Sequence, residues 1–352
     1  MQDVAIVSFV QSDCVRHAGA QNEVELIMPV VQAALKEAGL SSVQDVDFTC
    51  SGSCDYQQGA AFAFVAGVDA LGAVPPIKES HVEMDAAWAL YESWLKIQMG
   101  QAESALIYGF GKSSPGQLSN VLSLQLDPYY LAPLGVDTIS LAAMQARSLL
   151  ESGEVSEADL AEVVVNSRAN AKNNPHAQLS GDFTVDQLLA EPETVSPLRK
   201  HDCCPISDGA AAMIICTVEK AKAMGKPYAV IKGIDHRIET HHVTLRDLSR
   251  SPSVEIAAEN AGVHDAPVDV AEIYAPFSHQ EIIVKRALGL DDSVAINPSG
   301  GVLAGHLFMA SGLSRVGEVA KRIIAGEYKR GVAHATSGPC LQQNMITVLE
   351  GM

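Results

Sequence analysis

Two carboxylates stand at the start of an apolar segment that has helical periodicity. In HVEMDAAWALYESWLKIQMG, Glu83 and Asp85 come directly before a broad apolar face that continues to Gly100. A helix N-terminus carries unpaired amide hydrogens and the positive end of the helix dipole, so it favours an anion. The simplest interpretation is an N-cap with a second acid beside it. The same position also suits a nucleophile or an oxyanion, so a catalytic role for either acid stays open.

A histidine follows a glycine-rich turn later in the chain. The segment AINPSGGVLAGHLFMASG joins an apolar strand to an amphipathic helix and carries His306 directly after Gly305. Glycines such as Gly301 and Gly305 let the backbone approach a ligand closely, and the helix start that follows offers amide donors. An imidazole at such an entrance can polarise a carbonyl group or shuttle a proton. We therefore expect His306 to be catalytic and the two glycines to contact substrate.

Two further strand ends carry reactive side chains. AEIYAPFSHQE places Tyr274 between a strand and a helix, where its hydroxyl could donate to a developing oxyanion; a buried tyrosine bonded to backbone is an equally good interpretation. HATSGPCLQQN ends a strand at Gly338, with His334 before the turn and Cys340 after it. Cys340 could be a reactive thiol, although buried inert cysteines are commoner. We expect Gly338 and His334 to contact substrate.

The elements that must position these residues alternate along the chain. Short β-branched runs such as VAIVSFV, SALIYGFG and AAMIICTV alternate with segments of helical periodicity at 24–38, 86–99, 254–261 and 307–325, which favours α/β layers. LKEAGLSSVQDVDF resembles AAENAGVHDAPVDVAEI, and GQAESALIYGFG resembles GEYKRGVAHATSG at a similar offset. The sequence therefore predicts two copies of one unit.

A polar segment separates the two copies. Residues 113–200 are richer in polar residues, Pro and Asn, as in NAKNNPHAQLSGDFT, and this composition indicates an inserted helical and loop segment. We predict a first half at 1–112 and 201–222, an inserted loop domain at 113–200, and a second half at 223–352. Inserted loops over a rigid α/β frame commonly bind substrates.

Composition excludes several classes of protein. The chain has 352 residues, 47% of them apolar and 19% charged, which is typical of a globular protein large enough for two domains. Its net charge is −18 and no Lys/Arg cluster interrupts the acidic surface, so nucleic acid is not an expected partner. The apolar run 60–74 is interrupted by Asp69, so no spanning helix and no membrane association are expected.

The start of the chain and its cysteines indicate a reducing compartment. MQDVAIVSFVQSDC has an acidic residue at position 3, no basic region and too short an apolar run for export. Seven cysteines without a CxxC pair are typical of reduced thiols, so we expect a cytoplasmic protein. Cys50 and Cys54 lack a second ligand pair and would make a poor zinc site, so no metal is expected.

Taken together, these strand ends resemble the thiolase superfamily. CCPISDGAAAMII is similar to its Ser-Asp-Gly-Ala-Ala-Ala strand, NPSGGVLAGH to its Asn-Pro-x-Gly-Gly turn with Gly-His, and AEIYAPFSHQE to the joint that carries its Asn-Glu or His-Asp motif. The likeness is strongest to sterol-carrier-protein-type thiolases and to the lipid-transfer-protein aldolases of bacterial steroid side-chain degradation. It covers nearly the whole chain. It implies a five-layered αβαβα fold from two duplicated halves with a loop insertion, and acyl-CoA substrates.

The departures from the family pattern concern the chemistry. Counting back without gaps from GQAESALIYGFGK puts the position of the family's nucleophilic cysteine on Glu83, and small shifts of register give Met84, Asp85 or Ala86. None of these is a cysteine. Tyr274 stands where true thiolases carry Asn or His, and thiolytic acyl transfer therefore lacks its usual nucleophile.

Retro-aldol cleavage of a β-hydroxyacyl-CoA needs no acyl-enzyme. It needs a base for the hydroxyl proton, hydrogen-bond donors for the thioester enolate and an acid that protonates it. The steroid-related aldolases that the chain resembles also lack the nucleophilic cysteine, so the resemblance implies a carbon–carbon lyase acting on a lipid or steroid side chain. His306 and Tyr274 would be enolate donors or proton carriers, with Glu83 or Asp85 and Cys340 as further members. The coenzyme A thioester would be the substrate, with no tightly bound cofactor.

Two other activities remain open. An acyltransferase could use another cysteine, Cys340 or Cys54, and a catalytically silent subunit could support an active partner. The resemblance also implies a homodimer or larger assembly, and a possible partner subunit with an OB-fold and a zinc ribbon, as the steroid-related aldolases use.

Overall fold

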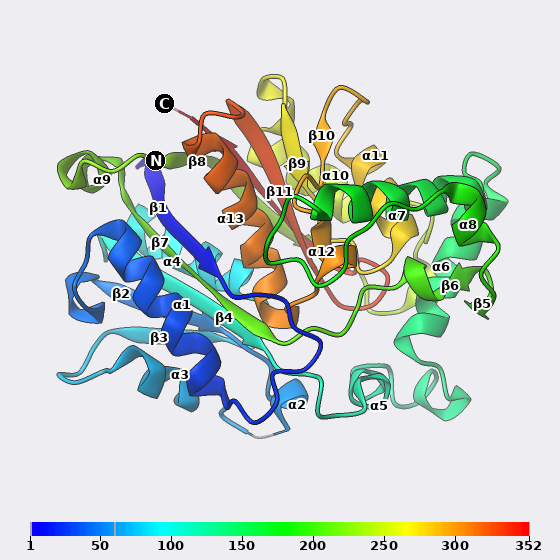
Figure 1. Cartoon of the computed structure of the whole chain (residues 1–352), viewed down its shortest axis with the longest axis horizontal. Helices are drawn as coiled ribbons and strands as arrows, with labels where there is room; N and C mark the ends of the chain where they lie inside the picture. The colour runs from blue at the N-terminus through cyan, green and yellow to red at the C-terminus, as the bar shows by residue number, and fades with distance from the viewer. Residues whose placement is uncertain (1, 60, 352) are drawn as a thin grey trace.

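The computed structural model describes residues 2–59 and 61–351, and a mixed β-sheet forms its framework (Figure 1). Within the described residues this sheet has ten strands, in the order β10-β9-β11-β12-β8-β1-β7-β4-β2-β3. The strands of the first half are β1 (Val4–Gln11), β2 (Phe48–Gly52), β3 (Glu79–Val82), β4 (Ser104–Gly111) and β7 (Gly209–Thr217). Those of the second half are β8 (Ala229–Ile238), β9 (Val270–Glu272), β10 (Ala295–Ile296), β11 (Arg330–Ser337) and β12 (Gln343–Glu350).

The two halves of the sheet repeat one topology. From either edge inward, the order is β3-β2-β4-β7-β1 in the first half and β10-β9-β11-β12-β8 in the second. In each half the three outer strands are parallel to one another. The fourth strand pairs antiparallel with the third, and the fifth pairs antiparallel with the fourth. The halves join where β1 pairs antiparallel with β8, as at Val4 and Ile231. The predicted duplication is therefore confirmed.

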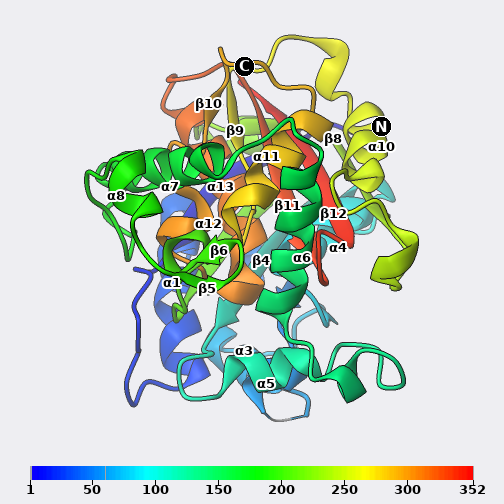
Figure 2. The same cartoon turned by 90° about the vertical axis from the view of Figure 1, so that its right-hand side faces the viewer.

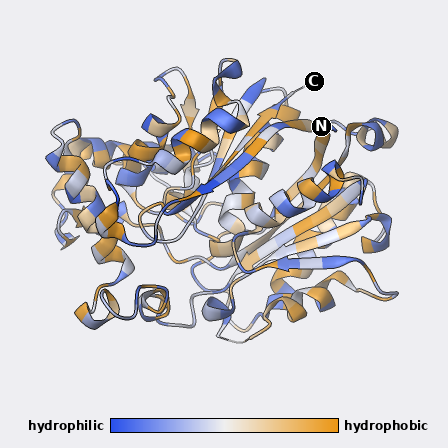
Figure 3. Cartoon of the chain, turned by 180° about the vertical axis from the view of Figure 1, so that it is seen from behind, coloured by the Kyte–Doolittle hydropathy of each residue, from blue (hydrophilic) through white to orange (hydrophobic). Residues whose placement is uncertain are grey.

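Two helices lie between the halves and others cover the outer faces. Helices α4 (Ala86–Gln98) and α13 (Ser311–Ile324) pack on each other; α4 also contacts β2 and β4, and α13 contacts β11 and β1. Helices α1 (Glu23–Ala38) and α3 (Phe64–Leu71) cover the first half, while α10 (Pro252–Ala261) and α11 (Ser278–Ala287) cover the second. Apolar residues run along most strands between these helices (Figure 3). The result is the predicted five-layered αβαβα arrangement.

Close packing in the middle layer depends on small residues. Gly317 of α13 lies against the ring of Phe9 on β1, and a Cβ at Gly317 would come within 2.2 Å of that ring. Gly52 at the end of β2 similarly lies against the backbone of Ala86, where a Cβ would come within 2.4 Å. These contacts bring the middle of α13 and the N-terminal end of α4 close to the sheet.

The segment between β4 and β7 contributes helices to one side of the molecule (Figure 2). It contains α5 (Leu118–Ser123), α6 (Thr138–Glu151), α7 (Glu157–Ala171), α8 (Val185–Leu189) and a ribbon of β5 (Glu193–Val195) with β6 (Leu198–Arg199). The remaining short helices are α2 (Asp55–Gln58), α9 (Val218–Met224) and α12 (Gly301–Ala304). The 3₁₀ turns are η1 (Val43–Asp45), η2 (Ala132–Leu134), η3 (Lys200–Asp202), η4 (Val243–Leu245), η5 (Val263–Asp265) and η6 (Phe308–Ala310). The exact boundaries of the three predicted domains remain a prediction.

One predicted helix begins later than its periodicity indicates. The apolar pattern predicts a helix from Leu307, whereas α13 begins at Ser311. Phe308 has a φ of 51°, a conformation that a regular right-handed helix does not contain. The residues before α13 therefore form a loop that ends in the 3₁₀ turn Phe308–Ala310. His306 therefore lies in this loop and does not begin a helix. Within the described residues, no helix is both long and apolar enough to span a membrane.

Candidate active site

A cavity of about 550 Å³ lies where the two halves and the inserted segment meet. The start of α4, the 274–277 joint, the loop at 306–309 and the turn at 338–341 all contribute to its wall, together with α5 and α6. Much of the lining is apolar: Leu118, Leu122, Leu126, Ile139, Ala142, Pro276, Phe277, Phe308, Met309 and Leu341. Five of the predicted site residues line it, namely Asp85, Tyr274, His306, Gly338 and Cys340. The cavity therefore combines an apolar wall with a small group of ionisable side chains.

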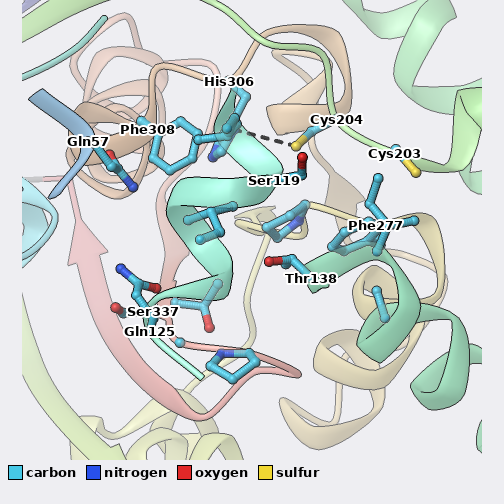
Figure 4. A pocket seen from close by; sticks show the side chains of 18 of the residues that line it. Gln57, Ser119, Gln125, Thr138, Cys203, Cys204, Phe277, His306, Phe308 and Ser337 are labelled. Carbon is cyan, nitrogen blue, oxygen red and sulfur yellow. Dashed lines mark hydrogen bonds between the residues drawn. The ribbon is translucent and has the colours of Figure 1, made fainter. Parts of the chain in front are cut away.

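The central polar contact joins Tyr274 and His306. The tyrosine hydroxyl lies 2.7 Å from Nε2 of His306, and 3.5 Å from the carbonyl oxygen of Phe308. The other ring nitrogen, Nδ1, lies 3.4 Å from Sγ of Cys204 (Figure 4). The backbone N–H of His306 donates to Oγ of Ser207, in the strand motif that precedes β7. The imidazole thus contacts the side chains of Tyr274 and Cys204, which come from two separate segments, and Ser207 holds the backbone of the same residue.

Burial keeps both members of this pair neutral. Desolvation, with a smaller effect of the Arg315 charge, lowers the pKa of His306 to about 3. Desolvation and the nearby Asp85 carboxylate raise the pKa of Tyr274 well above its ordinary value of 10. At neutral pH the phenol therefore keeps its hydrogen, and the imidazole carries a single N–H. Such a pair can donate a hydrogen bond to an oxyanion without itself gaining charge.

Asp85 is the acid that faces the cavity. It is the N-cap of α4, and its carboxylate accepts hydrogen bonds from the N–H groups of Ala87 at 2.8 Å, Gly312 at 2.8 Å and Leu313 at 3.2 Å. The N-termini of α4 and α13 therefore converge on one carboxylate. Desolvation nevertheless outweighs these donors, and burial raises the pKa of Asp85 from 3.8 to about 7. A carboxyl group poised near neutral pH can both accept and return a proton.

Glu83 lies outside the cavity. Its side chain is 47% exposed, accepts a hydrogen bond from the backbone N–H of Asp55 at 2.6 Å, and lies 3.4 Å from Nε2 of His81. The strand β3 ends at Val82, so the chain turns between Glu83 and Asp85, and the two acids point to different surroundings. Of the two acids left open by the sequence, the structure brings only Asp85 to His306 and Tyr274.

Cys340 lines the cavity but its thiol is engaged and protonated. Its Sγ donates to the carbonyl oxygen of Leu141 at 3.5 Å, and burial raises the pKa of Cys340 to about 11. Its own carbonyl oxygen accepts hydrogen bonds from Arg246 and from Nε2 of Gln145. Cys340 and Leu341 both have positive φ, 54° and 57°, and these bonds hold the turn in that conformation.

Three of the residues that were predicted to contact substrate pack within the protein and do not line the cavity. His334 is buried away from the cavity, with Nε2 at 2.9 Å from Oδ1 of Asn344. Gly305 packs on Cys14, where a Cβ would lie 2.7 Å from the Cys14 Cβ, and Gly301 packs on Asn297. These glycines allow close contact within the protein. Of the four residues predicted to contact substrate, only Gly338 lines the cavity.

Cys204 is a site residue that the sequence did not single out. It belongs to the quoted segment CCPISDGAAAMII, whose resemblance to a family strand drew attention to Ser207 to Ala212 and not to the cysteines before them. It lies 102 positions before His306, and no local pattern indicates their contact. Across 2–59 and 61–351, no group of three or more His, Cys, Asp or Glu residues is arranged to hold a metal ion.

Comparisons with known proteins agree with this architecture. No family model matches the chain. The chain is 27% identical to an acetyl-CoA acetyltransferase of Methanocaldococcus jannaschii, over 91% of this chain and 89% of that protein. The solved Ltp2-ChsH2(DUF35) aldolase superposes with a TM-score of 0.82 at 18% identity, covering 99% of this chain and 98% of that one. The chain resembles the thiolase superfamily in sequence and in fold.

A second sequence relative and a second solved structure extend the comparison. The thiolase-like chain is 32% identical to an acetyl-CoA acetyltransferase of Methanothermobacter thermautotrophicus over 60% of its own length, and this match spans 61% of that relative. Human mitochondrial 3-ketoacyl-CoA thiolase superposes with a TM-score of 0.79 at 18% identity, covering 100% of this chain and 99% of that one. One fold thus accommodates both a thiolase and an aldolase, so the chemistry of the thiolase-like chain must be argued from its own site residues.

Proposed function

We propose that the protein is an acyl-CoA carbon–carbon lyase that cleaves a β-hydroxyacyl-CoA by a retro-aldol reaction. The observation that carries the proposal is the position of Asp85, a carboxylate at the N-terminus of α4 that lines the same cavity as Tyr274 and His306. Thiolytic acyl transfer needs a thiolate nucleophile, whereas the three cysteines on the cavity wall, Cys203, Cys204 and Cys340, all have pKa values that burial raises.

The proposed reaction returns every proton that it removes. Ionised Asp85 accepts the proton of the β-hydroxyl group, the bond between the α and β carbons breaks, and the β carbon leaves as a ketone or an aldehyde. The electron pair of that bond enters the thioester as an enolate, whose oxygen accepts a hydrogen bond from the Tyr274 hydroxyl, and His306 positions that hydroxyl. Asp85 then returns the proton to the α carbon, which yields the shorter acyl-CoA. The pKa of Asp85, raised by burial to about 7, suits both steps.

The proposal extends to substrate class and assembly. The apolar wall formed by α5, α6 and the 274–277 joint suits a hydrocarbon acyl group of the lipid or steroid side-chain type. The Ltp2-ChsH2(DUF35) aldolase contains a second component, and this supports a partner subunit with an OB-fold and a zinc ribbon here. We also propose a homodimer or larger assembly, and a substrate that is itself the coenzyme A thioester, with no other tightly bound cofactor.

The test is a product assay on matched thioesters. The protein, alone and after co-purification with bound partners, is incubated with a panel of branched β-hydroxyacyl-CoA and β-ketoacyl-CoA thioesters, and products are identified by mass spectrometry. We expect a carbonyl compound and a shorter acyl-CoA. Asp85→Asn and Tyr274→Phe should each lower kcat by roughly 100-fold or more, the usual contribution of an acid–base group and of an oxyanion donor respectively. Glu83→Gln is the matched control, because that acid lies outside the cavity.

Two outcomes would reject the proposal. Formation of acetyl-CoA from acetoacetyl-CoA and CoA, without cleavage of any β-hydroxyacyl-CoA, would indicate a thiolase. Turnover by a complex that is unaffected by His306→Ala combined with Tyr274→Phe would indicate a silent subunit.

A second candidate function is acyl transfer through a cysteine, which the contact between Cys204 and His306 favours because a thiol beside an imidazole is a common nucleophile and base pair. It predicts a mass increase on a cavity cysteine after incubation with acyl-CoA.

A further inference from the structure

Cys204 is held against His306 by its own backbone. The N–H of Cys204 donates to the carbonyl oxygen of Pro276 at 2.8 Å, and Cys203 forms an isolated bridge with Phe277. These two contacts tie the cysteine pair to the same joint that carries Tyr274. The thiol of Cys204 then lies 3.4 Å from Nδ1 of His306 on the cavity wall (Figure 4). Among the described residues, it has no other side-chain hydrogen-bond partner.

The three side chains Cys204, His306 and Tyr274 form one hydrogen-bonded line with a fixed number of hydrogens. Burial raises the pKa of Cys204 to about 12 and lowers that of His306 to about 3, so the thiol keeps its hydrogen and the ring has one N–H. The line therefore carries one S–H, one N–H and one phenolic O–H. Two arrangements of these hydrogens are possible, and they differ in the ring nitrogen that carries the proton.

The surroundings favour one arrangement. If the thiol donates to Nδ1, the ring proton is on Nε2 and donates to the Tyr274 oxygen, and the phenolic hydrogen points onward to the carbonyl oxygen of Phe308 or to a ligand. A carbonyl oxygen can only accept, so it suits this direction. In the reverse arrangement the phenolic hydrogen is used on Nε2, and the hydrogen of Cys204 has no acceptor. The thiol is a weak donor, so this loss is modest by itself, but the reverse arrangement also leaves the carbonyl oxygen of Phe308 without the Tyr274 hydrogen.

We propose that Cys204 is a positioning residue that donates to Nδ1 of His306, places the ring proton on Nε2, and so leaves the Tyr274 hydroxyl hydrogen free for an oxygen atom of the bound ligand. The inference rests on the proposed function only for the identity of that oxygen, which would be the thioester oxygen that carries the enolate charge. The direction of the hydrogen bonds is a property of the free protein. Cys204 acts through His306 and forms no bond with the substrate.

The thiol can be replaced by groups that keep or remove its hydrogen. Cys204→Ser keeps an O–H donor on a slightly shorter side chain, whereas Cys204→Ala removes the donor and leaves the ring free to protonate either nitrogen. The net contribution of one hydrogen bond corresponds to about a five-fold effect, so we expect Cys204→Ala to lower kcat about five-fold with little change in KM, and Cys204→Ser to restore most of the loss. A nucleophilic role for Cys204 would instead abolish turnover in both variants.

The decisive measurement is the tautomer of His306 by ¹⁵N NMR in the ligand-free full-length protein, with the His306 signals assigned by their loss in His306→Asn. We expect an unprotonated Nδ1 and a protonated Nε2 in the wild type and in Cys204→Ser, and a mixture of tautomers in Cys204→Ala. Cys203→Ala is the matched control and should keep the wild-type pattern, because that thiol contacts the carbonyl oxygen of Arg199 and not His306.

Each outcome of this experiment decides the inference. A protonated Nδ1 in the wild type, or an unchanged tautomer in Cys204→Ala, would overturn it, and so would an acyl adduct on Cys204 after incubation with acyl-CoA. The wild-type spectrum alone tests the proton position if Cys204→Ala does not fold. Failure of the proposed function is separate, because it would appear as absence of cleavage products while the free protein still showed the expected tautomer.

Discussion

The protonation of Asp85 should make the stability of the protein depend on pH. The residue is 2% exposed, and burial raises the pKa of its carboxyl group from 3.8 to about 7. A carboxyl group whose pKa is higher in the folded state contributes stability that is fully present below pH 3.8 and is lost as the pH rises through 7. The rise in pKa corresponds to roughly 4 kcal/mol in total. Between pH 5 and pH 8 the loss should be about 2.5 kcal/mol.

The contribution of Asp85 can be isolated by comparison with Asp85→Asn. The amide does not titrate, and its altered contact with the N–H of Gly312 adds an offset that does not change with pH. Burial also raises the pKa of Glu281 to about 7, so the wild-type curve by itself would mix two groups. The difference between the two proteins cancels Glu281 and every other titrating group. The free energy of unfolding is measured by urea denaturation of both proteins from pH 5 to pH 8.5.

The expected result is a wild-type advantage that shrinks by about 2.5 kcal/mol between pH 5 and pH 8. A difference that stays constant across this range would refute the reasoning, because it would mean that the three N–H donors keep Asp85 ionised throughout. If the advantage of the wild type instead grew with pH, the pKa of Asp85 would be lower in the folded state than in the unfolded state.

Three further predictions follow from the same structure. The pH profile of kcat/KM should show one ionisation near pH 7 that disappears in Asp85→Asn, measured by initial rates, because the pKa of His306, lowered to about 3 by burial, places that ring outside the range. Arg315→Met should lower the free energy of unfolding by about 3–5 kcal/mol in urea, since it leaves the buried carboxylate of Glu272 without its ion partner; an unchanged midpoint would contradict this. Iodoacetamide should alkylate Cys340 at pH 7.5 roughly 100-fold more slowly than free cysteine, followed by mass spectrometry, because burial raises its pKa to about 11; labelling at the free-cysteine rate would contradict it.

Local patterns were sufficient for much of the fold. The alternation of strand and helix segments, with two similar sets of segments, predicted α/β layers built from a duplicated unit, and the matching strand orders confirm it. Such patterns succeed because side-chain periodicity depends on the element and the face that it buries. The start of α13 was predicted too early, since its apolar pattern extends back to Leu307 although Phe308 adopts a positive φ that ends regular helical geometry.

The site was only partly predictable. Asp85, Tyr274 and His306 were identified by their positions at strand ends and a helix start, and the structure brings them to one cavity. Glu83 was an equal candidate in the sequence, because both residues are acids near the start of the same helix and residue type alone does not show which one faces a cavity. Its exclusion from the cavity follows from the turn between β3 and α4.

The sequence by itself determined the order of the elements, their duplication, the absence of a cysteine at the start of α4, and the residue types available for chemistry. The tertiary structure alone decided which of these residues meet. The contact between Cys204 and His306 joins positions 102 apart, and the carboxylate of Asp85 receives N–H groups from a helix that begins more than 200 residues later. The protonation states are decided in the same way, because the pKa of Asp85 or His306 depends on desolvation by neighbours that only the folded chain supplies.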